Sequence, residues 1–183
     1  MEATVKGMFL HNVVEVIKQQ KGPSGLDDLR KKLGKITYGS FTNYPLEEEI
    51  RLNEAALEVL FGEINLKNYR ELGKLSFTVF TGSAFGKTLM SLFGTDVNKL
   101  AKTLQLLLMS VTTGIDINAE SQSSSSLVVT LTGAPYPPEY YEGIWQGAMS
   151  YLQNQRLINQ FTISTNAPLK NSYEYTLVWY EAA

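Results

Sequence analysis

The sequence predicts an α+β fold, in which an N-terminal helical half packs on a C-terminal four-stranded antiparallel sheet. Apolar residues recur at three- and four-residue steps over residues 1–111, which is typical of amphipathic helices. From residue 112 onward, alternating and β-branched segments surround one further helical segment, in the order strand–strand–helix–strand–strand. Because no long linker divides the 183 residues, we expect a single domain over 1–183, with a helical half (1–111) and a sheet half (112–183).

The first half is expected to contain a series of helices separated by glycine, proline and asparagine signals. The expected helical ranges are 5–19, 26–33, 45–61, 65–80, 85–93 and 96–111. Lys21–Gly25 should break the first helix from the second, and residues 35–44 are expected to form a loop.

The second half is expected to contribute four strands and one helix. The expected strands are 112–120, 127–132, 161–165 and 173–180, and the expected helix is 139–152. Gly143 and Gly147 are four residues apart and therefore share a helix face, which should let this helix lie close on the sheet. The apolar face of the same helix is wide enough to indicate burial on two sides.

A polar tract, Ser121–Ser126, separates the first two expected strands and predicts a hairpin loop. Modification of the serines at 123–126 is an alternative role, because a charge could be added there without burial. The hairpin loop is the favoured interpretation.

The composition excludes several classes of partner. The formal net charge is −2, so no basic excess predicts binding to nucleic acid or to an anionic membrane. There is no cysteine, which excludes disulfides and thiolate metal sites. We find neither a signal-peptide pattern nor an apolar run long enough to span a membrane, and we therefore expect a soluble, cytoplasmic protein.

No group of residues predicts catalysis, a metal site or a bound cofactor, so we expect a protein that is not an enzyme. His11 is the only histidine and has no evident partner to orient it as a base. Gly82–Thr88 resembles a phosphate-binding loop, but its first glycine is one residue too close and a helix precedes it, which favours a helix–helix turn. Glu47–Glu49 is interpreted as the solvated start of a helix.

Short motifs along nearly the whole chain resemble those of an uncharacterised bacterial family expanded in myxobacteria, a domain of unknown function. These motifs are Lys6–Phe9, Asn43–Leu46, Leu72–Gly73, Ser83–Gly86, Pro138–Tyr140, Gly143–Gly147 and Trp179. The resemblance implies no function, because none is established for that family.

A more distant resemblance is to the haem nitric-oxide-binding domains, the four-vinyl-reductase domains and the TRAPP subunits. Lys6–Gly7, Gly143 and Gly147 carry this resemblance, together with the strand–strand–helix–strand–strand order. The residues that bind haem in that group do not carry over. Asn98 stands where the resemblance places the proximal histidine, and Leu131, Gly133 and Pro135 stand near the propionate-binding motif. The resemblance therefore implies a relative without haem.

We retain two hypotheses of function. In the first, the chain is a sensory or binding domain for a hydrophobic small molecule held between the helical half and the sheet. Its expected wall residues are large apolar side chains of the later helices: Phe80, Phe85, Leu89, Leu104, Leu108, Trp145 and Met149. In the second, the core is filled and the chain is a protein-interaction module that forms a homodimer through its N-terminal helices.

Overall fold

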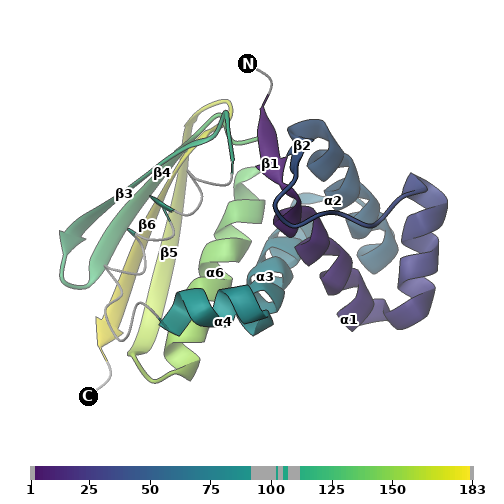
Figure 1. Ribbon diagram of the computed structural model, residues 1–183. Coiled ribbons are helices and arrows are strands. Elements are labelled where there is room, and N and C mark those ends of the chain that lie inside the picture. The colour runs from purple at the N-terminus through teal and green to yellow at the C-terminus, as the bar shows by residue number, and fades with distance from the viewer. Residues whose placement is uncertain (1–2, 92–101, 103–104, 107–111, 182–183) are drawn as a thin grey trace.

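The computed structural model describes residues 3–91, 102, 105–106 and 112–181, and these residues confirm the predicted α+β class (Figure 1). A helical N-terminal part is followed by a four-stranded antiparallel sheet, and the helix between the two strand pairs lies where the two parts meet. The helix expected over 96–111 lies almost wholly outside the described residues.

The helices before the sheet follow the expected ranges closely. They are α1 (Gly7–Leu33), α2 (Leu46–Phe61), α3 (Leu66–Gly82) and α4 (Ala84–Ser91). A kink interrupts α1 at Gly22, whose backbone φ is 64°, so the predicted break between two helical segments is confirmed. Gly62 ends α2 in the left-handed conformation, and the side chain of Asn65 caps α3 by accepting a hydrogen bond from the Asn68 N–H at 2.8 Å.

A two-stranded sheet was missed by the sequence analysis. Strand β1 (Thr4–Lys6) pairs with β2 (Asn43–Pro45), where a helix start and a loop were expected. The pairing joins segments almost forty residues apart, and the helical spacing of Val5 and Phe9 hid it. A bridge from Val5 to Thr112 then ties this small sheet to the chain just before the large one.

The large sheet has the order β3-β4-β6-β5, and every neighbouring pair is antiparallel. Its strands are β3 (Asp116–Ser123), β4 (Ser126–Thr132), β5 (Ile158–Leu169) and β6 (Ser172–Glu181). The predicted alternation in β3 is confirmed, since Ile117 is buried while Asp116 and Asn118 are exposed. Pro168 is tolerated because β5 lies at the edge of the sheet.

Two expected loops are shorter than the composition indicated. Most of Ser121–Ser126 belongs to paired strand, and only Ser124 and Ser125 form the turn. The segment expected to connect the last two strands, 166–172, is likewise mostly strand, with a turn at Lys170 and Asn171. Backbone pairing needs no apolar side chain, so a polar tract at a hairpin end can continue the ladder.

The helix between the strand pairs, α6 (Pro138–Asn154), lies between the sheet and α3 (Figure 1). Trp145, Met149 and Leu152 face the core beneath the sheet, while Tyr140 and Ile144 pack with the helices, so the predicted burial on two sides is confirmed. The described helices all lie on one side of the sheet (Figure 1).

The expectation that Gly143 and Gly147 bring α6 close to the sheet is wrong, because both glycines face α3. A Cβ on Gly143 would collide with the backbone carbonyl of Arg70, and a Cβ on Gly147 would meet the side chain of Phe77. Gly73 on α3 approaches the backbone of α6 in the same way, at the carbonyl of Tyr140. The glycines therefore allow the two helix backbones to touch.

The core consists of two clusters separated by α6. One cluster joins the inner face of the sheet to α6 and the described end of α4, and includes Leu89 and Met149. The other joins α1, α2 and α3 to the tyrosines around the start of α6. Tyr141 packs against both clusters, which places it at the boundary between the two halves.

Candidate functional site

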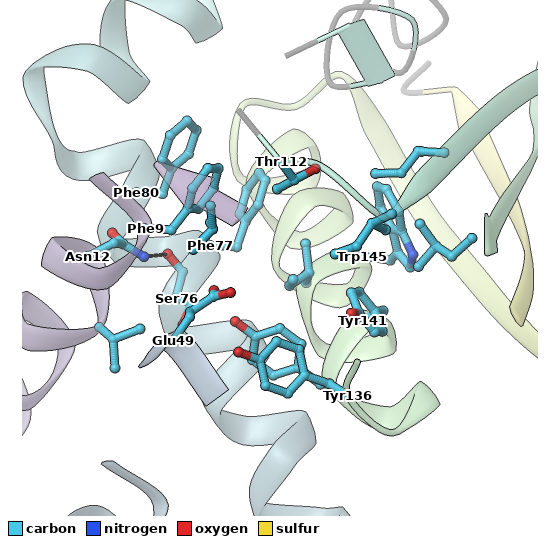
Figure 2. Close-up of a pocket in the computed structure, with 17 residues that line it drawn as sticks. Phe9, Asn12, Glu49, Ser76, Phe77, Phe80, Thr112, Tyr136, Tyr141 and Trp145 are labelled. Atoms are coloured by element: carbon cyan, nitrogen blue, oxygen red, sulfur yellow. Dashed lines mark hydrogen bonds between the residues drawn. The ribbon is translucent and has the colours of Figure 1, made fainter. Parts of the chain in front are cut away.

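A cavity of about 140 Å³ lies where the two core clusters meet. Helices α1, α2 and α3 form one side, and α6 with strands β3 and β4 forms the other. Figure 2 shows the residues that line it. The aromatic members of the wall are Phe9, Phe77, Phe80, Tyr136, Tyr140, Tyr141 and Trp145. Val5, Val13, Ile115, Ile117, Leu131 and Ile144 are its aliphatic members, so the surface is mostly apolar.

The residues predicted to form the wall of a binding site fall into three groups: those that line the cavity, those that lie elsewhere, and those outside the described residues. Phe80 and Trp145 line the cavity. Leu89 and Met149 are buried in the sheet-side cluster, and Phe85 exposes 44% of its surface while its ring packs edge-on against Phe80 with centroids 6.1 Å apart. Leu104 and Leu108 lie outside the described residues.

Glu49 is the least expected member of the wall. The interpretation of Glu47–Glu49 as a solvated helix start is wrong for this residue, because Glu49 is buried and lines the cavity. The sequence did carry a signal for its burial. Glu49 is spaced three or seven residues from Leu46, Leu52 and Ala56, which are all buried on the same face of α2.

Burial raises the pKa of the Glu49 carboxyl from its ordinary value of 4.5 to about 7, because an ionised carboxylate is poorly solvated there. A hydrogen bond with the Tyr136 hydroxyl lowers the pKa of Glu49, but by less than burial raises it. The fully buried Asn53 amide donates to the same Tyr136 oxygen at 2.7 Å and to the Glu49 main-chain oxygen at 3.2 Å.

The tyrosines beside Glu49 form a connected cluster. The Tyr136 ring centroid lies 4.5 Å from that of Tyr140 and 6.1 Å from that of Tyr141. Burial, together with the nearby Glu49 charge, raises the pKa of all three hydroxyls. The three groups are therefore neutral at physiological pH and can donate hydrogen bonds.

Within the described residues, three buried polar atoms of the cavity wall lack a hydrogen bond of good geometry. They are the indole nitrogen Nε1 of Trp145, the hydroxyl oxygen Oη of Tyr141 and the hydroxyl oxygen Oγ of Ser76. Ser76 still lies close enough to the Tyr140 hydroxyl, and the Tyr136 main chain to the Tyr141 hydroxyl, to lower the pKa of each tyrosine, so the Trp145 nitrogen is the most isolated of the three. Ser76 accepts a hydrogen bond from the Asn12 amide at 2.9 Å, but through its main-chain oxygen (Figure 2). Each unpartnered buried group typically costs about 1–3 kcal/mol, so this concentration at one cavity calls for an explanation.

Charges and metal ligands are sparse around the cavity. Within the described part of the wall, Glu49 is the one ionisable acid, and there is no lysine, arginine or histidine. His11 is exposed and does not belong to the described lining. The described residues also contain no grouping of three or more histidine or acidic side chains that could hold a metal ion.

The segment that resembled a phosphate-binding loop, Gly82–Thr88, spans the junction of α3 and α4, where Ser83 alone lies between the two helices; the favoured helix–helix turn is confirmed there. Ser83 follows α3, and its hydroxyl accepts a hydrogen bond from the Gly86 N–H at 3.0 Å. In the described chain no helix is both long and apolar enough to cross a lipid bilayer.

Comparison with known structures identifies the fold. A variant of Tt H-NOX has a TM-score of 0.71 at 13% identity, with 97% of this chain and 96% of that one covered. The H-NOX protein from S. oneidensis in the Fe(II)NO ligation state gives 0.69 at 14%, covering 95% and 98%. The Fe(II) unliganded H-NOX protein from K. algicida gives 0.64 at 11%, covering 96% and 97%. At these identities the similarity shows a shared fold alone.

Sequence comparison identifies the family. No curated protein matches the chain. The model of a family described as "Protein of unknown function (DUF2378)" matches residues 1–179, and the chain therefore belongs to that family. The predicted resemblance to a domain of unknown function is confirmed to this extent. Its expansion in myxobacteria, and the resemblance to four-vinyl-reductase domains and TRAPP subunits, stay predictions.

Proposed function

We propose that this member of the family is a binding or sensory domain that takes a small hydrophobic molecule into the cavity between its helical half and its sheet. The observation that carries the proposal is the cavity itself, which has an apolar, largely aromatic wall and a few buried polar groups. This composition is typical of small-molecule sites. The proposal assigns no catalytic step to the chain, and places it in the cytoplasm.

The volume sets the size of the ligand. An apolar cavity of about 150 Å³ accommodates a molecule such as benzene, whereas pockets for drug-sized ligands measure about 300–1,000 Å³. At about 140 Å³ the present cavity is of nearly this size, and corresponds to a molecule built on a single six-membered ring. The H-NOX proteins that share the fold support the proposal that this fold can bind a small molecule, since one of them is described in an Fe(II)NO ligation state.

Haem does not fit the described residues of this site. A porphyrin is much larger than a cavity of about 140 Å³. The described wall has no histidine for the iron and no arginine or lysine to pair with propionates, and the Glu49 carboxyl would repel them when ionised. We therefore propose that the domain works without haem.

A titration of the isotope-labelled chain with methylenecyclohexane, followed by NMR, tests the proposal. We expect saturable shifts confined to residues around the cavity. Ile115→Phe should abolish them, because the larger side chain fills space at a residue of the wall. Ile163→Phe is the matched control, since Ile163 is partly buried on β5 and does not belong to the described lining. Equal binding by both variants, or none by the unmodified chain, would contradict the proposal.

The homodimer through the N-terminal helices is the alternative function. On this half, Phe41, in the segment before β2, exposes 82% of its surface and is the side chain that a partner could cover. Light scattering on the purified chain tests the alternative. A dimer mass that Phe41→Ser converts to a monomer mass would support it, and a monomer mass at all concentrations would reject it.

A further inference from the structure

The three unpartnered polar atoms at the cavity carry information about the ligand. Trp145, Tyr141 and Ser76 contribute them, and each atom is buried. Trp145 and Tyr141 are four residues apart on α6 and therefore lie on neighbouring turns of one helix face. Ser76 approaches the cavity from the opposite side, on α3. Partners for groups on both sides can come from one molecule held between them.

The chemistry of these groups determines what is missing. The Trp145 indole nitrogen can only donate a hydrogen bond, and the hydroxyls of Tyr141 and Ser76 can donate as well. Two amides at or beside the wall already donate to protein oxygens, although the Asn53 oxygen Oδ1 is itself buried without a partner. Asn12 donates to the Ser76 main chain, and Asn53 donates to Tyr136. An acceptor is therefore the group that the wall lacks.

The charge of the site excludes an anion as that acceptor. The one ionisable acid of the described wall is Glu49, and no described lining residue carries a positive charge. A carboxylate or phosphate ligand would be repelled by the ionised Glu49 and would meet no counter-charge on the described wall. A neutral oxygen, as in a ketone, ester or ether, can accept from the indole and the hydroxyls without this penalty.

We propose that the ligand is a neutral, single-ring hydrophobic molecule with a carbonyl-type hydrogen-bond acceptor, which accepts from the Trp145 indole and the Tyr141 hydroxyl. The inference rests on the proposed function and narrows it from any hydrophobic molecule to one chemical class. Its ring contacts Phe77 and Phe80 across the cavity. The Ser76 hydroxyl already interacts with the Tyr140 hydroxyl, so the proposal does not depend on it.

Two probes of nearly equal shape test the class. Cyclohexanone and methylenecyclohexane differ in one group, a carbonyl oxygen against a methylene. The chain has two tryptophans, and Trp179 does not belong to the described lining, so its indole N–H signal serves as an internal control. We expect cyclohexanone to shift the Trp145 indole N–H signal downfield, with methylenecyclohexane shifting it much less and Trp179 unaffected by either.

A variant provides the second measurement. Tyr141→Phe removes only the hydroxyl and should weaken cyclohexanone binding about 3- to 10-fold, while methylenecyclohexane binding changes less than about 2-fold. Tyr38→Phe is the matched control, because the Tyr38 hydroxyl is directed to the Lys35 main chain at 3.4 Å and lies away from the described lining.

The outcomes separate the two proposals. If methylenecyclohexane binds but cyclohexanone neither shifts the Trp145 signal nor responds to Tyr141→Phe, the ligand class is wrong and hydrophobic binding stands. If cyclohexylamine binds more tightly than both probes and Glu49→Gln removes that preference, the site takes an ammonium group, and the class is again wrong. If methylenecyclohexane does not bind, the proposed function fails, and if cyclohexanone does not bind either, this inference fails with it.

Discussion

The four-stranded sheet and the α3–α6 junction are built on different principles. In the sheet, side chains alternate between a buried apolar face and a more exposed face, and the central strand β6 buries Tyr175 and Leu177 in this way. At the junction, glycines bring two backbones into contact, and beside them lie a buried acid, a tyrosine cluster and polar atoms without partners. The sheet is the more regular structure, and the cavity lies between it and the helices.

This difference shows which part of the molecule contains groups that lower the free energy of unfolding. Buried polar groups without partners and a buried carboxyl both disfavour folding, and they gather around the cavity rather than in the sheet. Such departures from a filled apolar core are typical of functional sites. Substitutions at the junction should therefore have larger effects than substitutions on the outer face of the sheet.

The largest effect is expected from Gly143→Ala. The new methyl group would collide with the Arg70 carbonyl and force α3 and α6 apart. We expect the free energy of unfolding to fall by about 3 kcal/mol, although alanine is the better helix former by about 1 kcal/mol. Urea denaturation measures the change.

Gly82→Ala is the control for this substitution, because a Cβ there would meet no atom within 4 Å apart from its chain neighbours and the backbone of its own helix. It should leave the free energy of unfolding unchanged or raise it slightly, through the helix preference of alanine. Equal losses from both substitutions would show that the close approach of the two helices is not what Gly143 provides.

The second-largest effect is expected in the pH dependence of the free energy of unfolding, through the carboxyl of Glu49. The unfolded carboxyl releases its proton near pH 4.5, whereas the folded one holds it until about pH 7. Between these values the unfolded state alone loses the proton, so stability falls as the pH rises and levels off above 7. The loss attributable to this group is on the order of 2–3 kcal/mol. The groups that face it, Tyr136, Tyr140 and Tyr141, stay neutral in this range because their pKa values are raised.

Urea denaturation at pH 4.5 and at pH 7.5 measures this slope. Glu49→Gln should flatten it, because the amide does not titrate. Glu47→Gln, on the same turn of α2 but exposed, is the matched control and should keep the slope of the unmodified chain. A slope that survives in Glu49→Gln would assign the pH dependence to another group.

The third effect concerns the hydrogen bond that ties the sheet to α6. The Tyr175 hydroxyl donates to the Pro138 carbonyl at 2.8 Å, and Tyr175 is fully buried in the central strand β6. Tyr175→Phe should lower the free energy of unfolding by about 1 kcal/mol, the usual net value of one such bond. Thermal denaturation with calorimetry checks it. Tyr180→Phe, on the exposed end of the same strand, should have no measurable effect.

The sequence predicted the sheet better than the junction, and the reason is physical. Strand alternation, helix caps and the break at Gly22 are local signals, and the structure confirms them. The face on which Gly143 packs depends on where α3 lies, which no local pattern states. The pairing of β1 with β2 and the burial of Glu49 depend in the same way on contacts distant in sequence.

The candidate site was predicted only in part for the same reason. Phe80 and Trp145 were identified because large apolar side chains on late helices point to a wall. Tyr141, Ser76 and Glu49 were missed, since one polar residue within an apolar stripe looks like an exception until the cavity beside it is known. The spacing of Glu49 from Leu46 and Ala56 was the usable signal.

The smallest effect is expected on the outer face of the sheet. Ser164 on β5 is exposed and pairs directly with Thr176 on β6. Ser164→Thr should raise the free energy of unfolding by a few tenths of a kcal/mol, through a β-branched cross-strand pair, and Ser164→Ala should lower it by a similar amount. Both shifts lie near the resolution of urea denaturation, so matched curves in one buffer are needed. A loss above about 1 kcal/mol in Ser164→Thr would mean that the outer face is packed against something, and the contrast between an open sheet and a constrained junction would then have to be abandoned.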